Sequence, residues 1–320
     1  MKSFVKGFLA LCLLLATVPG ASGSESGLPD VIAHLMMAGL SLDDSPGAAP
    51  DNATADDAKP CAHVSFSRNL KYGESDLNVL DVATSDSKEA MPRPVLLFVA
   101  GESFTGDDAA AGAAGTRLDE ATCFAARHGM VGVRMAYRPA PADQWPAGAQ
   151  DVAAATSWGH QNIDLFGGNP NEIVTIGYSV GAFHVASFLA HPEFQELDSN
   201  VAGVVLVSGI YRISTDASAT EKSYFGSDAS KYDERSAFPG ILKIEKPILL
   251  AWSVRDPPSL IAQAEKLKEL LCHSTSHCPR TTVLDKRESL PSIFSTDTSG
   301  GSLAKPTLEL VREIESRGLP

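Results

Sequence analysis

The segment that most constrains the fold spans residues 172–182 and reads EIVTIGYSVGA. An apolar, strand-like run leads directly into Gly-x-Ser-x-Gly, and a helical sequence follows at once. Gly177 and Gly181 lack the side chains that would collide in a sharp turn, so Ser179 can project above a sheet. A helix beginning at Val180 would present its amino end, which favours negative charge, beside that serine. The pattern predicts a nucleophilic serine; the alternative is a purely structural strand-to-helix turn.

The rest of the chain alternates apolar runs with helical stretches. Several runs are continuously apolar, such as Val95–Val99, as is typical of strands buried on both faces. We predict strands at Val64–Arg68, Leu77–Val82, Val95–Ala100, Val131–Tyr137, Ile173–Tyr178, Val201–Ser208, Ile248–Ser253 and Thr281–Leu284. We predict helices at Thr116–His128, Pro146–Phe166, Val180–Ala190, Ser259–Leu271 and Leu303–Arg317.

The order of these elements indicates an α/β fold. The first two strands follow each other without a helix, which predicts an antiparallel hairpin. The others alternate with helices, which favours parallel strands joined by right-handed crossovers. We therefore expect an eight-stranded, mostly parallel sheet with helices on both faces. The stretch from Arg212 to Lys246 lacks a clear core element and fits an inserted cap or a long loop over a pocket.

The amino-terminal residues have the pattern of an export signal. Lys2 and Lys6 precede the apolar run Phe8–Val18, and small residues follow at Ala21-Ser22-Gly23. This run is too short to span a bilayer. We predict a signal peptide over 1–23, an extension and linker over 24–60, and one catalytic-type domain over 61–320. The protein is expected to be exported, to the periplasm or the medium, and free of the membrane after cleavage.

Four cysteines remain once the signal peptide, with Cys12, is removed. An even number in an oxidising compartment favours two disulfides. Cys272 and Cys278 enclose a short loop, which makes a local bridge the first choice and leaves Cys61 to pair with Cys123. Zinc ligation by Cys-His-x₃-His-Cys at 272–278 is the alternative, although its donors are closer together than structural zinc sites usually have them. We expect no metal.

Composition excludes several classes of protein. The chain has 26 basic and 39 acidic residues and a formal net charge of −13, so a basic face for nucleic acid is not expected. No glycine-rich phosphate loop follows any predicted strand, which argues against a nucleotide-type cofactor. A small-molecule substrate without a cofactor is the expectation, and the sequence leaves the oligomeric state open.

Five segments in the same order resemble the α/β-hydrolase family. The resemblance is to secreted carboxylesterases of the hormone-sensitive-lipase-like and feruloyl-esterase-like branch, over about 64–317. In chain order the segments are Phe98–Phe104, Tyr137–Pro141, Trp145–Asp151, the serine turn at 177–181, and Asp256-Pro257-Pro258.

The resemblance implies roles for individual residues. It makes Ser179 the nucleophile and Asp256 the acid of a catalytic triad. The backbone N–H groups of Val180, Glu102 and Ser103 would form the oxyanion hole, in which fixed donors stabilise the tetrahedral intermediate of acyl transfer. The implied activity is hydrolysis of a small carboxylic ester.

Two departures from the family pattern affect the chemistry. Where relatives have His-Gly-Gly-Gly, this chain has Ala100-Gly101-Glu102-Ser103, which places a carboxylate at the oxyanion loop. The triad histidine should follow the last strand, but no histidine lies beyond His277, and Ser289 falls at the expected position. Without a base a serine hydroxyl is a weak nucleophile.

Other histidines offer alternatives for the base. His184 follows the serine on the same predicted helix, and we interpret it as a packed, hydrogen-bonded neighbour of the turn. His273 and His277 would reach Ser179 only through a rearranged loop. Two hypotheses follow: an exported ester hydrolase with a weak or unconventional base, or a degenerate hydrolase that binds an acyl or ester ligand, or a partner, without turnover.

Overall fold

The computed structural model describes residues 61–86, 92–101, 103–106, 116–194, 201–274, 278–286, 290–294 and 303–317. The predicted signal peptide and linker, residues 1–60, lie outside this part of the chain. No helix among the described residues is both long and apolar enough to cross a membrane.

Eight strands form a single sheet in the order β1-β2-β4-β3-β5-β6-β7-β8. The first two strands make the predicted antiparallel hairpin, and β2 also runs antiparallel to β4; every other neighbouring pair is parallel. The eight predicted strands are thus confirmed. Their bounds are β1 Val64–Lys71, β2 Val79–Ser85, β3 Arg93–Gly101, β4 Val131–Met135, β5 Gly168–Ser179, β6 Gly203–Val207, β7 Ile248–Ser253 and β8 Arg280–Leu284.

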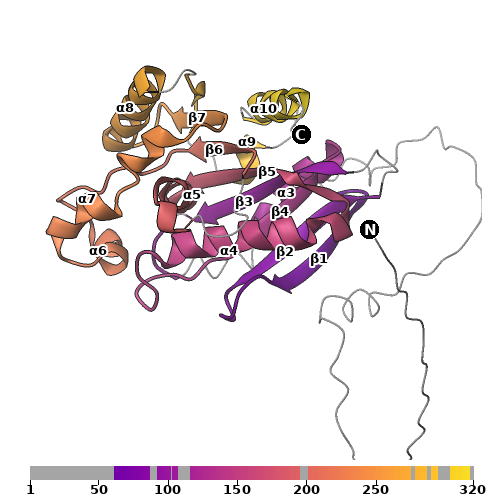
Figure 1. Cartoon of the computed structure of the whole chain (residues 1–320), viewed down its shortest axis with the longest axis horizontal. Coiled ribbons are helices and arrows are strands. Elements are labelled where there is room, and N and C mark those ends of the chain that lie inside the picture. The colour runs from indigo at the N-terminus through magenta and orange to yellow at the C-terminus, as the bar shows by residue number, and fades with distance from the viewer. Residues whose placement is uncertain are drawn as a thin grey trace, which may run out of the picture. The chain divides into compact units, whose positions relative to one another are not determined.

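Helices cover both faces of the sheet, as predicted (Figure 1). On one face the strands pack against α3, α9 and α10, and on the other against α4, α5 and α8. Strands β3, β4, β6 and β7 are buried along almost their whole length, because side chains on both faces meet a helix layer. The helices are α3 Thr116–Arg127, α4 Ala147–Asn162, α5 Val180–Ala190, α8 Pro258–Ser274, α9 Leu290–Ile293 and α10 Ala304–Ser316. Short 3₁₀ turns follow α4 and α5, η1 at Ile163–Phe166 and η2 at Pro192–Phe194.

An insertion separates β6 from β7, where the sequence predicted a cap or loop. It contains α6 (Ala219–Phe225), η3 (Ala229–Lys231), α7 (Tyr232–Arg235) and η4 (Gly240–Lys243). Helix α6 begins with a capping box, in which the Ser218 and Glu221 side chains each accept a hydrogen bond from the other's backbone N–H. Despite its short elements, the insertion buries several aromatic residues in the main core, namely Tyr211, Tyr224, Phe225 and Tyr232.

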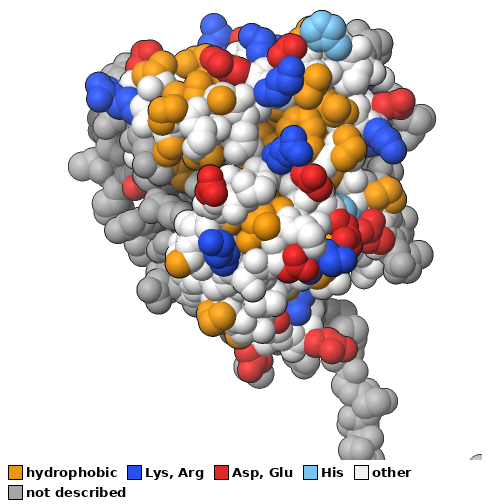
Figure 2. Space-filling view, turned by 90° about the vertical axis from the view of Figure 1, so that its left-hand side faces the viewer, with side chains coloured by type: hydrophobic (Ala, Val, Ile, Leu, Met, Phe, Trp, Pro, Cys, Tyr) orange, Lys and Arg blue, Asp and Glu red, His pale blue; other side chains and the backbone are white. Residues whose placement is uncertain are grey.

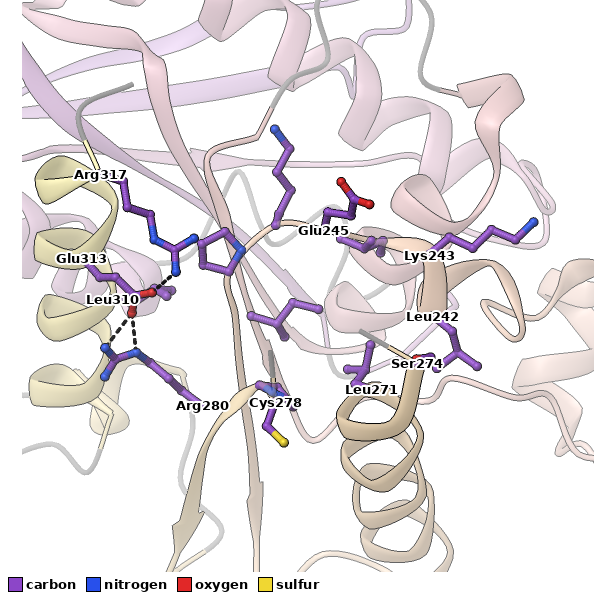
Figure 3. Close-up of a pocket in the computed structure, with 15 residues that line it drawn as sticks. Leu242, Lys243, Glu245, Leu271, Ser274, Cys278, Arg280, Leu310, Glu313 and Arg317 are labelled. Atoms are coloured by element: carbon purple, nitrogen blue, oxygen red, sulfur yellow. Dashed lines mark hydrogen bonds and ion pairs between the residues drawn. The ribbon is translucent and has the colours of Figure 1, made fainter. Parts of the chain in front are cut away.

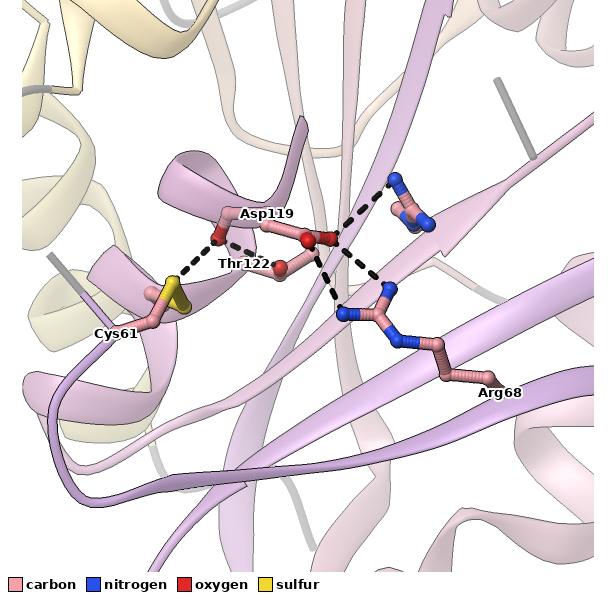
Figure 4. The surroundings of a disulfide bond; sticks show 6 residues. Cys61, Arg68, Asp119 and Thr122 are labelled. Atoms are coloured by element: carbon pink, nitrogen blue, oxygen red, sulfur yellow. Dashed lines mark hydrogen bonds and ion pairs between the residues drawn. A yellow bond between two sulfur atoms is a disulfide. The ribbon is translucent and has the colours of Figure 1, made fainter. Parts of the chain in front are cut away.

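Both predicted disulfides are present, Cys61–Cys123 and Cys272–Cys278. The first ties the start of the described domain to α3, next to a cluster of charged side chains of which Asp81 and Arg134 are buried (Figure 4). There Asp119 pairs with Arg68 and Arg134, and Arg134 also pairs with Asp81 at 2.6 Å. Because these residues come from β1, β2, β4 and α3, the network fixes the antiparallel edge of the sheet to the helix beneath it.

Candidate active site

Ser179 ends β5 in a strained backbone conformation, with φ 53° and ψ −116°, and α5 begins at the next residue. A non-glycine residue at positive φ is costly and marks a position that the surrounding structure enforces. The two flanking glycines explain how the turn closes. A Cβ on Gly177 would lie 2.5 Å from Cα of Ala182, and one on Gly181 would lie 2.0 Å from the carbonyl oxygen of Val99. The two glycines of the Gly-x-Ser-x-Gly sequence are thus required by the turn itself.

The parallel register brings two further strand ends beside Ser179. Gly101 at the end of β3 is paired with Ser179, so the loop after Gly101 starts next to the serine. On the other side Tyr178 is paired with Val207, the last residue of β6, which places Ser208 beside Ser179. Residues at these carboxyl ends share one edge of the sheet, the edge where ligands bind in open α/β folds.

Asp256 lies in the loop after β7 and is 5% exposed. Its Oδ2 accepts hydrogen bonds from the Ser208 hydroxyl at 2.6 Å and from the backbone N–H of Ser253 at 2.9 Å. Ser208 itself has a positive φ of 51° and is buried. The carboxylate is therefore held at the serine's edge of the sheet, linked through Ser208 to the strand that adjoins β5.

The loop after β3 is anchored at Phe104. Its carbonyl accepts a hydrogen bond from the N–H of Ala140 at 2.9 Å, and Thr105 forms a parallel bridge with Ala140. The hydroxyl of Ser103 accepts a bond from the N–H of Thr105 at 3.2 Å. Glu102, one of the expected oxyanion donors, lies outside the described residues, whereas Ser103 is half-buried and Val180 is buried at the start of α5.

An ion pair fixes the segment that carries Ala140. Asp151 on α4 accepts from the backbone N–H of Arg138 at 2.7 Å and from its Nε at 2.9 Å. This hydrogen-bonded carboxylate raises the pKa of Arg138. The ion pair thus joins segment 137–141 to segment 145–151. Ala140 in the first of these segments bonds the loop next to Ser179.

His184 is fully enclosed on α5. Burial lowers its pKa to about 3, so the ring is neutral near pH 7. The ring packs against Gly148 of α4, where an added Cβ would lie 2.4 Å from its Cε1, and its Nδ1 lies 3.5 Å from the hydroxyl of Tyr224. These contacts agree with its interpretation as a packed neighbour of the turn.

The other histidines do not supply an evident base. His191 has its Nδ1 2.7 Å from the Ser187 carbonyl oxygen, and His273 has its Nδ1 2.6 Å from that of Glu269. In the part of the chain that the structure describes, no histidine forms a hydrogen bond with Ser179. His277 and Ser289, the position of the family base, lie outside that part.

Two sizeable pockets are present among the described residues. One, of about 660 Å³, is formed at the amino ends of β7 and β8, where Arg280 and Arg317 both pair with Glu313 (Figure 3). Because β5, β7 and β8 are parallel, this pocket is at the opposite edge of the sheet from Ser179. The other, of about 640 Å³, lies between α8 and η4, on the side of the molecule seen in Figure 2, where apolar patches are exposed among charged residues.

Sequence reasoning missed Ser208. Its partner Asp256 is 48 residues away in the chain, and only the strand order brings the two together. The available signal was positional, since Ser208 ends the predicted strand Val201–Ser208 and the next predicted strand, Ile248–Ser253, leads to Asp256.

Comparison with known proteins places this geometry in a family. The model of the BD-FAE family matches residues 80–271, which include Ser179, Ser208 and Asp256. Esterase LipC of Mycobacterium tuberculosis is 34% identical over 169 residues, covering 49% of this chain and 40% of LipC. Para-nitrobenzyl esterase of Bacillus subtilis is 28% identical over 141 residues, covering 41% and 27% respectively. The chain thus matches less than half the length of either relative.

Solved structures of esterases share the fold. An esterase B from Lactobacillus rhamnosis, inhibited by a tributyrin phosphonate, superimposes with a TM-score of 0.65 at 14% identity, covering 80% of this chain and 87% of that one. A bacterial heroin esterase superimposes with a TM-score of 0.62 at 18% identity, covering 89% of each chain. At these identities the likeness establishes the α/β-hydrolase fold.

Proposed function

Because this chain belongs to the BD-FAE family of hormone-sensitive-lipase-like α/β-hydrolases, we propose that it hydrolyses carboxylic esters by acyl transfer through Ser179. The observation that carries the proposal is the strained turn at Ser179, whose glycines are enforced by backbone contacts under 3 Å. The esterase names of its relatives support the same activity.

In this reaction the Oγ of Ser179 attacks the ester carbonyl carbon and its proton passes to a base. The backbone N–H groups of Val180, Ser103 and Glu102 stabilise the resulting oxyanion, which collapses as the C–O bond to the leaving group breaks and the protonated base gives its proton to the departing oxygen, releasing the alcohol. Water attacks the acyl-serine in a second, matching step and releases the carboxylic acid. Asp256, held by Ser208, orients the base and stabilises its charged form.

The base is one of the two parts of the proposed site that depart from the family pattern, the other being the oxyanion loop. No histidine follows position 277, and Ser289 stands where relatives have one. We therefore propose slow turnover with a weak or unconventional base. In a serine hydrolase of another fold, loss of the histidine costs about six orders of magnitude in kcat, while about 10³-fold acceleration over water remains.

The test is release of p-nitrophenol from a short-chain ester. The wild type, Ser179→Ala and the surface control Ser65→Ala are compared as purified proteins. Hydrolysis that is lost in Ser179→Ala and retained in Ser65→Ala is the expected result. Ser65 suits the control because it is exposed on β1, at the far end of the strand order from the acid loop.

The second candidate is a binding protein for an acyl or ester ligand, or for a partner, that does not turn it over. The missing histidine and the carboxylate at Glu102 favour this candidate. Equal, near-background rates for wild type and Ser179→Ala would support it and contradict the ester hydrolase.

We also propose that the protein is exported. Lys2, Lys6 and the apolar run Phe8–Val18 support this, and two disulfides suit an oxidising compartment. Amino-terminal sequencing of the protein recovered from culture medium or periplasm should give Ser24 as the first residue. Retention of Met1 in the native host would contradict export by cleavage.

A further inference from the structure

Besides the hydrogen bonds of Ser103 and of the Phe104 carbonyl, the loop that carries the expected oxyanion donors is held by an aromatic side chain, that of Phe104. Phe104 is 3% exposed, two residues past Glu102. Its ring lies edge-on to Phe183 and His184 of α5, with centroids 5.7 and 5.8 Å apart. One side of the Phe104 ring therefore packs against α5, the helix that begins directly after Ser179.

The other side of the ring packs against the insertion. Phe104 is stacked on Tyr224, with ring centroids 4.9 Å apart and an interplanar angle of 18°, and lies edge-on to Phe225 at 4.9 Å. Both residues close α6, about 120 positions further along the chain. The aromatic packing around Phe104, which holds the oxyanion loop, is therefore complete only when the insertion is folded.

Tyr224 is itself fixed at three points. Its hydroxyl accepts the N–H of Gly148 at 3.1 Å and lies 3.5 Å from Nδ1 of His184, which is neutral and can accept in return. Its carbonyl accepts the N–H of Trp145 at 2.9 Å. The Tyr224 side chain is 1% exposed and contacts α4 and α5 through its hydroxyl and Phe104 through its ring. The position of the Phe104 ring therefore depends on the positions of these two helices.

From these contacts we infer that Tyr224 is a positioning residue, which sets the distance between the oxyanion loop and Ser179 through its stack on Phe104. The inference rests on the proposed function, since it concerns the same site. Removing the stack should displace the donors from the developing oxyanion while leaving ester binding nearly unchanged. The loss should therefore fall on kcat.

The experiment compares Tyr224→Leu with Tyr224→Phe and with Tyr232→Leu. Tyr224→Leu removes the stack, and Tyr224→Phe retains it. Tyr232 is the matched control, because it is 2% exposed in the same insertion and meets the ring of Phe225 at 6.4 Å. We expect Tyr224→Leu to lower kcat about 10- to 100-fold with KM within about twofold, a range set by the cost of a misplaced group. Tyr232→Leu should keep kcat within about threefold, and Tyr224→Phe, which keeps the ring but loses the hydroxyl contacts to Gly148 and His184, should have a kcat between those of Tyr232→Leu and Tyr224→Leu.

A second variant covers the case in which Tyr224→Leu does not fold. Phe104→Leu removes the same stack from the loop side and leaves the insertion intact. It should lower kcat in the same way. If Phe104→Leu keeps the wild-type kcat, or if Tyr232→Leu loses as much as Tyr224→Leu, Tyr224 is a packing residue and the inference is wrong.

Hydrogen exchange separates this inference from the proposed function. The Ala140 amide donates to the Phe104 carbonyl, so its exchange reports whether the loop is seated. We expect faster exchange of this amide in Tyr224→Leu and Phe104→Leu than in Tyr232→Leu. If the wild type hydrolyses the ester no faster than Ser179→Ala, this result contradicts the proposed ester hydrolysis but not the positioning role of Tyr224. Unchanged Ala140 exchange in both stack variants would overturn the positioning role.

Discussion

At the scale of single residues, the candidate site contains two serines in strained backbone conformations on adjacent strand ends. Ser179 and Ser208 have φ values of 53° and 51°. The first projects a hydroxyl to the edge of the sheet, and the second directs its hydroxyl to Asp256. Both conformations are maintained by the core around them, which explains how unfavourable backbone angles persist at the place where chemistry is proposed.

Ser208→Ala tests the link to the acid. Alanine has the same backbone cost at positive φ, so the change isolates the hydroxyl that donates to the Asp256 carboxylate at 2.6 Å. We expect the free energy of unfolding to fall by about 1.5–3 kcal/mol, the usual worth of a hydrogen bond to a charged group. Urea unfolding at pH 7 measures this. A loss below about 0.5 kcal/mol would mean that Asp256 is held by other groups.

Sequence alone predicted Ser179 from its Gly-x-Ser-x-Gly pattern between a strand and a helix, whereas Asp256 was predicted through the family resemblance and its order among the matching segments. It could not predict Ser208 or Tyr224, because their roles arise from tertiary contacts across 48 and 120 residues. Nothing in the chain near Tyr224 distinguishes it from Tyr232. The two tyrosines differ only in the folded structure, where Tyr224 stacks on Phe104.

At the scale of elements, the turn between β5 and α5 determines the site, and Gly181 tests it. Gly181→Ala would place a Cβ 2.0 Å from the backbone oxygen of Val99, which cannot move without breaking the β3–β5 register. We expect a loss of about 3 kcal/mol or more, or failure to fold. Gly106→Ala is the control, because its Cβ would lie 3.6 Å from Pro139 in ordinary contact. Equal soluble yield and equal melting temperature for both variants would contradict the argument.

The antiparallel edge depends on a buried ion-pair network. The side chain of Arg134 is 4% exposed, and its guanidinium bonds Asp81 at 2.6 and 2.9 Å. Asp81→Asn removes one of the carboxylates that pair with this buried cation, and we expect a loss of about 3 kcal/mol in denaturant unfolding. Asp76→Asn breaks an exposed pair with Lys71 and should cost about 0.5 kcal/mol or less. Similar losses for the two variants would mean that the buried network adds little.

All eight predicted strands are present, although β5 begins at Gly168 and not at Ile173 as predicted. Several were marked by continuous apolar runs, which are typical of strands buried on both faces, whereas β1 and β8 are largely exposed. The insertion was predicted only as a segment without a core element. Its helices are seven and four residues long, too short for a helical period to show in the sequence. They form because aromatic residues such as Tyr224 and Phe225 pack into the main core.

At the scale of the whole molecule, the two disulfides should contribute unequally. Cys61 and Cys123 are 62 positions apart, whereas Cys272 and Cys278 are 6 apart. Because a longer loop restricts the unfolded chain more, we expect replacing the first pair with serine to cost about 4 kcal/mol and the second about 2. Thermal unfolding of the two double variants measures the order. A greater loss from the second pair would contradict this assignment.

The fold as a whole places Ser179, Ser208 and Asp256 after adjacent strands, at one edge of the sheet. The insertion packs against Phe104 in the neighbouring loop. This arrangement supports the proposal that Ser179 is a nucleophile, although no histidine follows position 277 in the sequence. The account therefore depends on whether the Ser179 hydroxyl forms a covalent bond with an acyl-like electrophile.

The most direct test is intact-mass measurement and peptide mapping after incubation with an aryl alkylphosphonate, which traps a nucleophilic serine as its phosphonate ester. The account expects one adduct per chain on Ser179, absent from Ser179→Ala and unchanged in Ser65→Ala. No adduct after prolonged incubation, or one carried by another residue, would contradict the claim that Ser179 is the nucleophile.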